Sequence, residues 1–169
     1  FCLNYIMAKK NQMINYQDDT KVHPALIKYC GYCLNKATIR LRTLMNEELK
    51  DFNLITGDLA LLKIIQAGEL ISQIQLGDQL GIDKASMVKL IDSLEKRKML
   101  ERIAHPTDRR VKNLQLTKWG KKVLDQCQTA KLRAEKKFFE PLTTSEEKAF
   151  RKLVQKLIPA PTLTASVKK

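Results

Sequence analysis

The sequence predicts a mainly α-helical protein with one small β-hairpin, an α+β fold in which a compact head is joined to a helical scaffold. Two short helical patterns flank Gly81, and a basic, turn-rich segment between residues 100 and 116 follows them. Long apolar stripes at helical spacing lie on either side of this region. A chain of 169 residues is long enough for one compact core, or for a small head fused to such a scaffold.

Both ends of the chain are expected to lie outside the folded part. Residues 1–21 are predicted to form a flexible N-terminal arm, and residues 159–169 a C-terminal tail. Phe1 cannot be a natural initiator whereas Met7 can, so residues 1–6 are expected to be vector-derived. We expect no secretory signal, internal repeat or low-complexity linker in this sequence.

The first helix is marked by apolar residues at steps of three, four and one, which form a single stripe nearly twenty residues long. These residues are Leu26, Cys30, Cys33, Leu34, Ala37, Leu41 and Leu44. A second helix is expected between Ile55 and Ile65, and Thr56 is its candidate N-cap. This second helix would connect the scaffold to the head.

The third helical pattern runs from Ile71 to Leu80 and ends at Gly81. Ser72 and Gln75 are three residues apart, so each can cap a backbone donor of the other. Gly81 tolerates the left-handed conformation that a tight turn between two helices requires. The residues expected to face inward are Ile74, Leu76 and Leu80.

The fourth helical pattern begins after Asp83, a candidate N-cap. Its inward stripe consists of Met87, Val88, Ile91 and Leu94. The outer side is small at its start and basic farther on, with Lys84, Ala85, Ser86 and Lys89. A helix that enters the major groove of duplex DNA needs this pattern, because short residues allow close approach and long cations reach phosphates or guanine edges. The alternative is a solvated helix in an ordinary helical bundle.

A β-hairpin is predicted next, with strands at Leu100–His105 and Val111–Leu116 around a turn-rich tip. An arginine at such a tip can enter the minor groove beside a helix in the major groove. The candidate DNA contacts in this hairpin are Arg109, Arg110 and Lys112. Asp108 would repel phosphates, so we assign it a structural role in which it pairs with a neighbouring cation. Helix, turn, helix and hairpin together predict a winged helix-turn-helix.

Two further helices are expected after the hairpin. Thr117 is the N-cap of a helix that reaches about Phe139. The last helix begins at Thr144, where Glu147 would complete a capping box, and Pro159 ends it. The apolar residues of this last helix are Phe150, Leu153, Val154, Leu157 and Ile158. Terminal helices this apolar either fold back on their own head or associate with a second chain.

The charge distribution supports a nucleic-acid partner. The chain carries 31 Lys and Arg against 18 Asp and Glu, a net charge of +13, of which +8 falls between Lys84 and Lys122. Basic charge concentrated on the helix-turn-hairpin is the electrostatic footprint expected of a DNA-binding head. A membrane is not an expected partner, because no apolar run spans a bilayer and the cations are not on one amphipathic helix.

The segment from Ser86 to Gly120 resembles the MarR family of bacterial transcriptional regulators. The most specific part is Asp108-Arg109-Arg110 followed by Leu116-Thr117 and Gly120, and the resemblance extends from about Pro24 to Ile158. It implies a homodimer that binds a palindromic duplex operator through successive major grooves, as a repressor released by a small-molecule or oxidant signal. It also implies a small aromatic or phenolic effector held between scaffold and head.

The resemblance divides the folded part of the chain. A helical dimerisation region is expected at residues 22–50 and 118–158, and the winged helix-turn-helix domain at residues 54–117. Three positions depart from the family pattern: Lys98 replaces a helix-ending Gly, Gly77 replaces Ala, and Lys89 replaces Arg. Lys98 is expected to fray or re-angle the end of the recognition helix. Lys89 would contact phosphate as a point charge.

The cysteines suggest two alternative roles. Cys30 and Cys33 have redox or metal-ligand spacing, while Cys2 and Cys127 are isolated, and the absence of a secretory signal favours reduced thiols in the cytoplasm. Because both lie on an apolar stripe, buried inert thiols are the first interpretation. The second comes from regulators of the same family that sense organic hydroperoxide, and it makes Cys30 a candidate redox sensor with Cys33 as its partner. A zinc site is not expected, because a closed site would need a second pair of thiolate ligands beside Cys30 and Cys33.

Enzymatic activity is not expected, and neither is a cofactor. The sequence has no Gly-rich phosphate loop and no recognisable nucleophile, base and acid pattern. The alternative to a DNA-binding regulator is a winged-helix interaction module that binds a protein or RNA partner through its basic face. The two differ in whether binding discriminates a palindromic duplex from a scrambled one.

Overall fold

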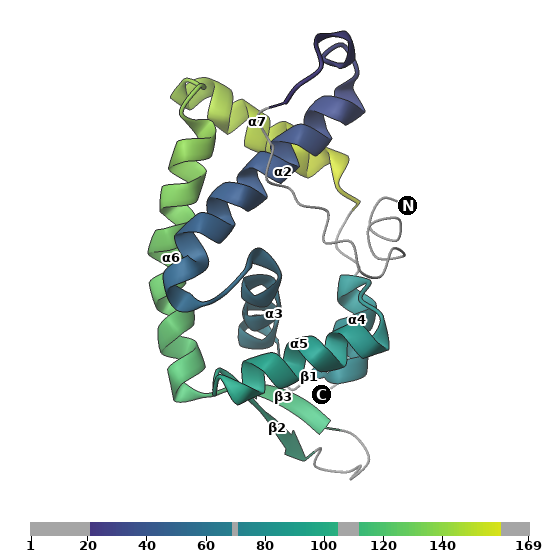
Figure 1. Cartoon of the computed structure of the whole chain (residues 1–169), viewed down its shortest axis with the longest axis vertical. Helices are drawn as coiled ribbons and strands as arrows, with labels where there is room; N and C mark the ends of the chain where they lie inside the picture. Colours follow the sequence, from purple (N-terminus) through teal and green to yellow (C-terminus); the bar gives the residue numbers. More distant parts are fainter. Residues whose placement is uncertain (1–20, 69–70, 105–111, 160–169) are drawn as a thin grey trace.

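The computed structural model describes residues 21–68, 71–104 and 112–159, and these residues are mainly helical with a small antiparallel sheet (Figure 1). The elements in chain order are η1 (Pro24–Leu26), α2 (Cys30–Leu49), η2 (Lys50–Phe52), α3 (Thr56–Ala67), β1 (Ile71–Ser72), α4 (Gln73–Leu80), α5 (Lys84–Lys96), β2 (Leu100–Ala104), β3 (Lys112–Leu116), α6 (Lys118–Phe139) and α7 (Thr144–Leu157). The α+β fold class and the winged helix-turn-helix are confirmed.

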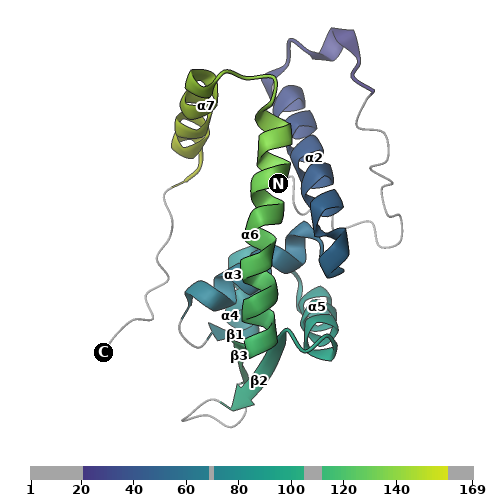
Figure 2. The same cartoon turned by 90° about the vertical axis from the view of Figure 1, so that its left-hand side faces the viewer.

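Helix α6 connects the two parts of the molecule. It starts beside β2 and β3 at one end and reaches α7 at the other, and Figure 2 shows α2 and α7 on opposite sides of it. Among the described elements, α2 and α6 pack most extensively, and small residues between them such as Ala130 and Ala134 are fully buried and allow the helices to approach closely. Helix α3 lies between this pair and the head, as expected of a connecting helix.

One hydrophobic core continues from the head into the scaffold. Helical spacing on each element places its apolar residues on the side that faces the others. The fully buried side chains of α3 and the head include Leu61, Leu62, Leu76, Met87, Ile91, Leu94 and Leu100, and Leu49 and Leu124 extend the core between α2 and α6. Ile74 was predicted to face inward but is 68% exposed, because it lies in the first turn of α4, on the side away from the core.

The hairpin is the predicted one, and it forms part of a three-stranded sheet with order β1-β3-β2. Leu100 pairs with Leu116 and Ala104 with Lys112 in an antiparallel register. Strand β1 pairs Ile71 with Leu114 and was not predicted, because two residues are too short to show an alternating pattern. Residues 105–111, which contain the predicted hairpin tip, lie outside the described residues.

The motif Leu116-Thr117-x-x-Gly120 ties α6 to the sheet. The Thr117 hydroxyl accepts a hydrogen bond from the Gly120 amide at 2.9 Å and donates to the Lys98 carbonyl at 2.6 Å. A Cβ atom on residue 120 would lie 1.8 Å from the Met99 carbonyl oxygen, so only glycine allows this approach. Thr117 is therefore the N-cap that the sequence predicted, and the spacing of the motif follows from backbone contact.

Three predicted helix starts differ from the structure. Leu26 lies in the separate turn η1, so the first helix begins at Cys30. The N-cap of α3 is Ile55 rather than Thr56, and the Ile55 amide donates to Asp58 Oδ2 at 3.1 Å. Before α7 the capping box joins Thr143 to Glu146, because Thr143 and Thr144 each have a glutamate three residues on and the earlier pair is used.

Helix α7 has no buried residue in the single chain. Leu153, Leu157 and Ile158 are 59%, 75% and 61% exposed, and its contact with α6 runs through an Arg151 ion pair with Glu135 and through Phe139 and Phe150. An apolar face this exposed on a terminal helix is typical of an interface that a single chain leaves uncovered. None of the helices within the described ranges has both the length and the apolar composition that a membrane span requires.

Candidate nucleic-acid interface

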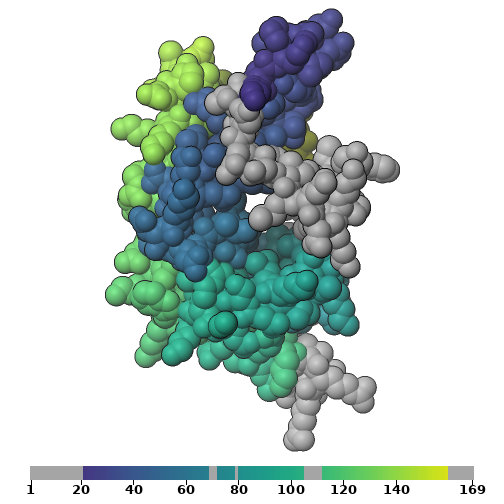
Figure 3. Space-filling model, viewed as in Figure 1, coloured from purple at the N-terminus to yellow at the C-terminus, as the bar shows by residue number. Residues whose placement is uncertain are grey.

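Helix α5 is positioned by its N-cap. Asp83 accepts hydrogen bonds from the Ser86 amide at 3.0 Å and from the Ser86 hydroxyl at 2.7 Å, so the first turn is closed by one side chain. The predicted outward side is confirmed for Lys84, Ala85 and Lys89, which are exposed, whereas Ser86 is half-buried and its hydroxyl is occupied by Asp83. In the space-filling view the segment around α5 forms part of the outer surface at one end of the molecule (Figure 3).

The turn before α5 depends on two glycines. Gly81 has φ of 61° and ends α4 as predicted. At Gly77 a Cβ would lie 3.3 Å from the Ile82 carbonyl oxygen, so the glycine lets α4 approach the turn closely, and the Ile82 amide donates to the Gly77 carbonyl at 3.0 Å. Alanine at this position would require the turn to shift by a few tenths of an ångström.

The end of α5 also explains the second departure from the family pattern. The helix stops at Lys96, Arg97 is its C-cap, and Lys98 has φ of 57°, in the left-handed region that glycine adopts without cost. Lys98 therefore does not fray or extend the helix but takes the conformation of the glycine it replaces. The Met99 amide then donates to the Leu94 carbonyl at 3.0 Å and begins the path into β2.

An ion-pair cluster fixes the wing against α5, and the sequence did not reveal it. Arg102 on β2 contacts Asp92 Oδ1 at 2.5 Å and also pairs with Glu95, which accepts a further hydrogen bond from the Arg102 amide at 3.2 Å. Asp92 and Glu95 are three residues apart on α5 and so face the same direction. The cluster fixes the angle between helix and wing, and it neutralises two carboxylates near the basic surface.

The remaining wing residues are only partly described. Lys112 is exposed on β3, opposite Ala104, as predicted for a candidate DNA contact. Asp108, Arg109 and Arg110 lie outside the described residues. Their proposed roles therefore rest on the sequence.

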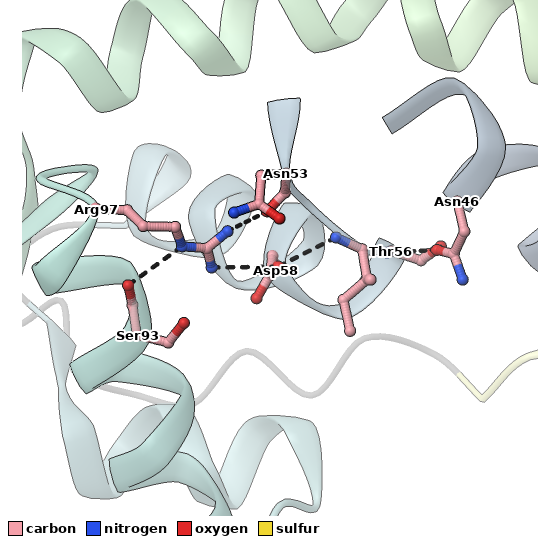
Figure 4. A network of polar contacts seen from close by, with 7 residues as sticks. Asn46, Asn53, Thr56, Asp58, Ser93 and Arg97 are labelled. Atoms are coloured by element: carbon pink, nitrogen blue, oxygen red, sulfur yellow. Dashed lines mark hydrogen bonds and ion pairs between the residues drawn. The ribbon is translucent and has the colours of Figure 1, made fainter. Parts of the chain in front are cut away.

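A polar network lies where α5 meets the start of α3 (Figure 4). Arg97 donates to the carbonyl oxygens of Asn53 and Ser93 and pairs with the buried Asp58. Thr56, two residues before Asp58, donates from its amide to Asn46 on α2. An open groove beside the network is lined by Asn53, Ile55, Asp58, Ser86, Lys89, Leu90, Ser93 and Arg97. Sequence reasoning missed this network, because its members are spread over about fifty residues and share no local pattern.

A second, smaller cavity of about 240 Å³ lies between α2, α3 and α6. Its exposed wall is largely apolar, and the lining also contains two cations. The lining residues are Met45, Thr56, Leu59, Ala60, Lys63, Cys127, Gln128 and Lys131. Cys127 also lines the cavity, and burial raises the pKa of its thiol. The described residues contain no cluster of His, Cys, Asp or Glu that could hold a metal ion.

The structure corrects the interpretation of the paired cysteines as buried. Cys30 and Cys33 are both exposed in the single chain, in the first turn of α2, and Cys33 Sγ lies 3.0 Å from the Ile27 carbonyl oxygen. The apolar stripe that contains Cys30 and Cys33 faces solvent in the first turn of α2, because α2 contacts α6 only farther along the helix. Lys28, the nearest cation in sequence, lies over the Tyr29 ring at 5.3 Å.

Comparison with known proteins shows what this chain is similar to. A sequence model of the MarR family matches residues 57–112, from the first turn of α3 to the start of β3. A probable transcriptional regulator from Pseudomonas aeruginosa is 26% identical, with a TM-score of 0.70 over 79% of this chain and 99% of that one.

Two of the similar structures contain DNA. The transcriptional repressor CouR, bound to a 23-mer DNA duplex, is 24% identical with a TM-score of 0.74 over 82% of this chain and 99% of that one. A mutant MarR from E. coli, complexed with operator DNA, is 22% identical with a TM-score of 0.68 over 76% and 93%. MarR-family proteins are transcriptional regulators rather than enzymes. Residues 57–112 therefore match the MarR family model, and the fold of about four fifths of the chain is similar to that of MarR-family structures.

Proposed function

We propose that the chain binds a palindromic duplex DNA operator as a homodimer and acts as a repressor that a small-molecule or oxidant signal releases. The observation that carries this proposal is the exposed, basic outer side of α5, held by its Asp83 cap and flanked by the wing. The residues proposed to contact DNA are Lys84, Ala85, Ser86, Lys89, Arg109, Arg110 and Lys112. The DNA complexes of CouR and of the E. coli protein support the same assignment.

The homodimer is supported by the uncovered apolar surface of the terminal helices. Leu153 and Leu157 project from α7 and Ile158 follows its last residue, and these three side chains are 59%, 75% and 61% exposed. A pair of heads related by a two-fold axis would meet successive major grooves of one palindrome. Residues 22–50 and 118–158 would then serve as the dimerisation region.

Lys89 provides the direct test. It is exposed on α5, and replacing it with alanine should weaken duplex binding and reduce the slope of log K against log salt by about one, as loss of one phosphate contact does. Lys136→Ala is the matched control, because Lys136 is also exposed but lies in the last turn of α6, at the opposite end of the molecule (Figure 1). Equal effects of the two variants would remove α5 from the interface. If the protein binds an RNA or protein partner more tightly than the palindromic duplex, the alternative of a winged-helix interaction module would be supported instead.

One candidate signal is a small aromatic or phenolic effector. The cavity between α2, α3 and α6 has the size of a one-ring compound, an apolar lining, and the cations Lys63 and Lys131 for an anionic group. Titration with one-ring aromatic acids should raise the melting temperature of the wild type and leave Lys63→Met unaffected. An equal rise in both would place the compound elsewhere.

The other candidate signal is an oxidant acting on Cys30. The Cys30 thiol would reduce an organic hydroperoxide to its alcohol and become a sulfenic acid, and Cys33 would then displace water to form a disulfide. Exposure of both thiols in the first turn of α2 supports this route. Stoichiometric hydroperoxide should release operator DNA from the wild type but not from Cys30→Ser. An equal response of both proteins would leave the effector as the signal.

A further inference from the structure

Arg97, at the end of the recognition helix, forms two side-chain hydrogen bonds and one ion pair within the described part of the chain. It follows the last residue of α5, and its guanidinium donates to the Asn53 carbonyl, donates to the Ser93 carbonyl at 3.2 Å, and lies 3.4 Å from Asp58 Oδ2 (Figure 4). Asn53 belongs to the turn between α2 and α3. The end of α5 is therefore attached to an element outside the helix-turn-helix.

Asp58 is the central residue of this attachment. Its side chain is only 8% exposed, and the same Oδ2 atom that faces Arg97 accepts the Ile55 amide at 3.1 Å. A buried carboxylate is stabilised only when hydrogen bonds and a counter-charge replace water. Arg97 supplies that charge, so the two residues hold the start of α3 and the end of α5 in one geometry.

The network continues into the scaffold. Thr56, beside Ile55, donates to Asn46 Oδ1 from its amide at 2.9 Å and from its hydroxyl at 2.6 Å, and Asn46 is part of α2. The order of contacts is therefore α2, the start of α3, Asp58, Arg97 and α5. Each contact is specific in direction, unlike the apolar packing around it.

We propose that the Asp58–Arg97 pair is a positioning contact that sets the orientation of the recognition helix relative to the scaffold, and so the spacing at which two heads meet DNA. This inference rests on the proposed operator binding. Arg97 has a competing role, because an arginine beside the basic surface could contact a phosphate directly. The two roles make opposite predictions for Asp58.

Asp58→Asn distinguishes the two roles of Arg97, because they predict changes of opposite sign in DNA affinity. The substitution retains the acceptor for the Ile55 amide and raises the net charge by one, so electrostatics alone would tighten DNA binding. A positioning role predicts instead that operator affinity falls about tenfold with an unchanged salt slope, because the helix loses its fixed orientation. Asp51→Asn is the matched control, because Asp51 is exposed in η2 and forms no ion pair among the described residues. It should bind as tightly as the wild type or tighter.

The remaining measurements distinguish positioning from a general loss of stability. Binding is measured by anisotropy below the melting transition of each variant, on duplexes whose half-site separation varies by one base pair. The wild type should show one sharp optimum, and Asp58→Asn a flattened or shifted one. If Asp58→Asn does not fold, Arg97→Gln at the helix end serves in the same assay. In Arg97→Gln, adding Asp58→Asn should have little further effect.

The outcomes are distinct. The inference would be overturned if Asp58→Asn bound the operator as tightly as the wild type or tighter, with the same optimum of half-site separation. It would also be overturned if Arg97→Gln kept that optimum while its slope of log K against log salt fell by about one, because Arg97 would then contact a phosphate. Failure of the wild type to bind any duplex would instead refute the proposed function. In that case amide hydrogen exchange measured without DNA still tests the positioning role of Asp58. The inference predicts that Asp58→Asn exchanges faster than the wild type at the end of α5 and at the same rate in α4.

Discussion

Lys98 occupies a position where the backbone requires a conformation that lysine disfavours. Its φ of 57° costs a non-glycine residue about 1 kcal/mol relative to glycine. Lys98→Gly should therefore raise the free energy of unfolding by about that amount, provided that the added freedom of the unfolded chain does not cancel the gain. Urea denaturation followed by circular dichroism measures the change.

Lys96→Gly is the matched control for this prediction. Lys96 is the last residue of α5 and has helical geometry, so glycine there should lower stability by up to about 1 kcal/mol. Opposite signs for two substitutions of the same type, two residues apart, would confirm the left-handed position. A loss of stability in both would contradict it.

Single residues explain what the sequence could and could not predict. Ser72, Gly81, Asp83 and Thr117 were predicted correctly because capping and turn formation are local and depend on residues within a few positions. The inward placement of Ile74 and the burial of Cys30 failed, because an apolar stripe does not show where along a helix its packing partner ends. The roles of Arg97 and Arg102 depend on contacts between elements and had no local signal.

At the scale of elements, the clamp between wing and recognition helix can be measured. Arg102 pairs with Asp92 and Glu95, and its side chain is 22% exposed, so its coupling to Glu95 should be about 0.5–1 kcal/mol in a double-mutant cycle and should fall at high salt. The cycle with Glu101 is the control, because Glu101 is adjacent in sequence but forms no ion pair among the described residues. Equal coupling in both cycles would show that Arg102 does not hold the wing.

The ion pairs between α2 and α6 should make stability depend on pH. Lys137 at 2.8 Å and Arg133 at 2.5 Å donate to Glu48, and these hydrogen bonds hold the pKa of its carboxyl below the usual value. Because the folded pKa is the lower one, the stabilisation is present above the unfolded value of about 4.3 and is lost as pH falls through the folded value. Glu48→Gln should therefore lower the melting temperature at neutral pH but progressively less as the solution is acidified below about pH 4.

Glu47→Gln serves as the control for the pH dependence. Glu47 is the exposed neighbour of Glu48, and it forms no ion pair in the part of the chain described. Its substitution should shift the melting temperature little at either pH. A Glu48→Gln difference that stays constant between neutral and acidic solution would show that the charge of Glu48 does not stabilise the α2–α6 interface.

For the whole molecule, the exposed faces of the terminal helices predict an obligate pair of chains. Sedimentation at micromolar concentration should give twice the chain mass. A chain that ends after Pro141 loses α7 and should be monomeric or insoluble, because the apolar surface that α7 contributes is gone and its contact site on α6 is uncovered. A monodisperse full-length monomer would contradict the proposed dimerisation region.

Selection of binding sites from random duplex DNA tests the central claim most directly. The full-length protein is mixed with a random library at physiological salt, and the retained duplexes are sequenced after several rounds. The account predicts that the retained duplexes share an inverted repeat whose half-sites are about one helical turn apart, or a multiple of it. Retention of duplexes without any common sequence, or preference for single-stranded RNA over duplex DNA, would contradict operator binding by this helix and wing.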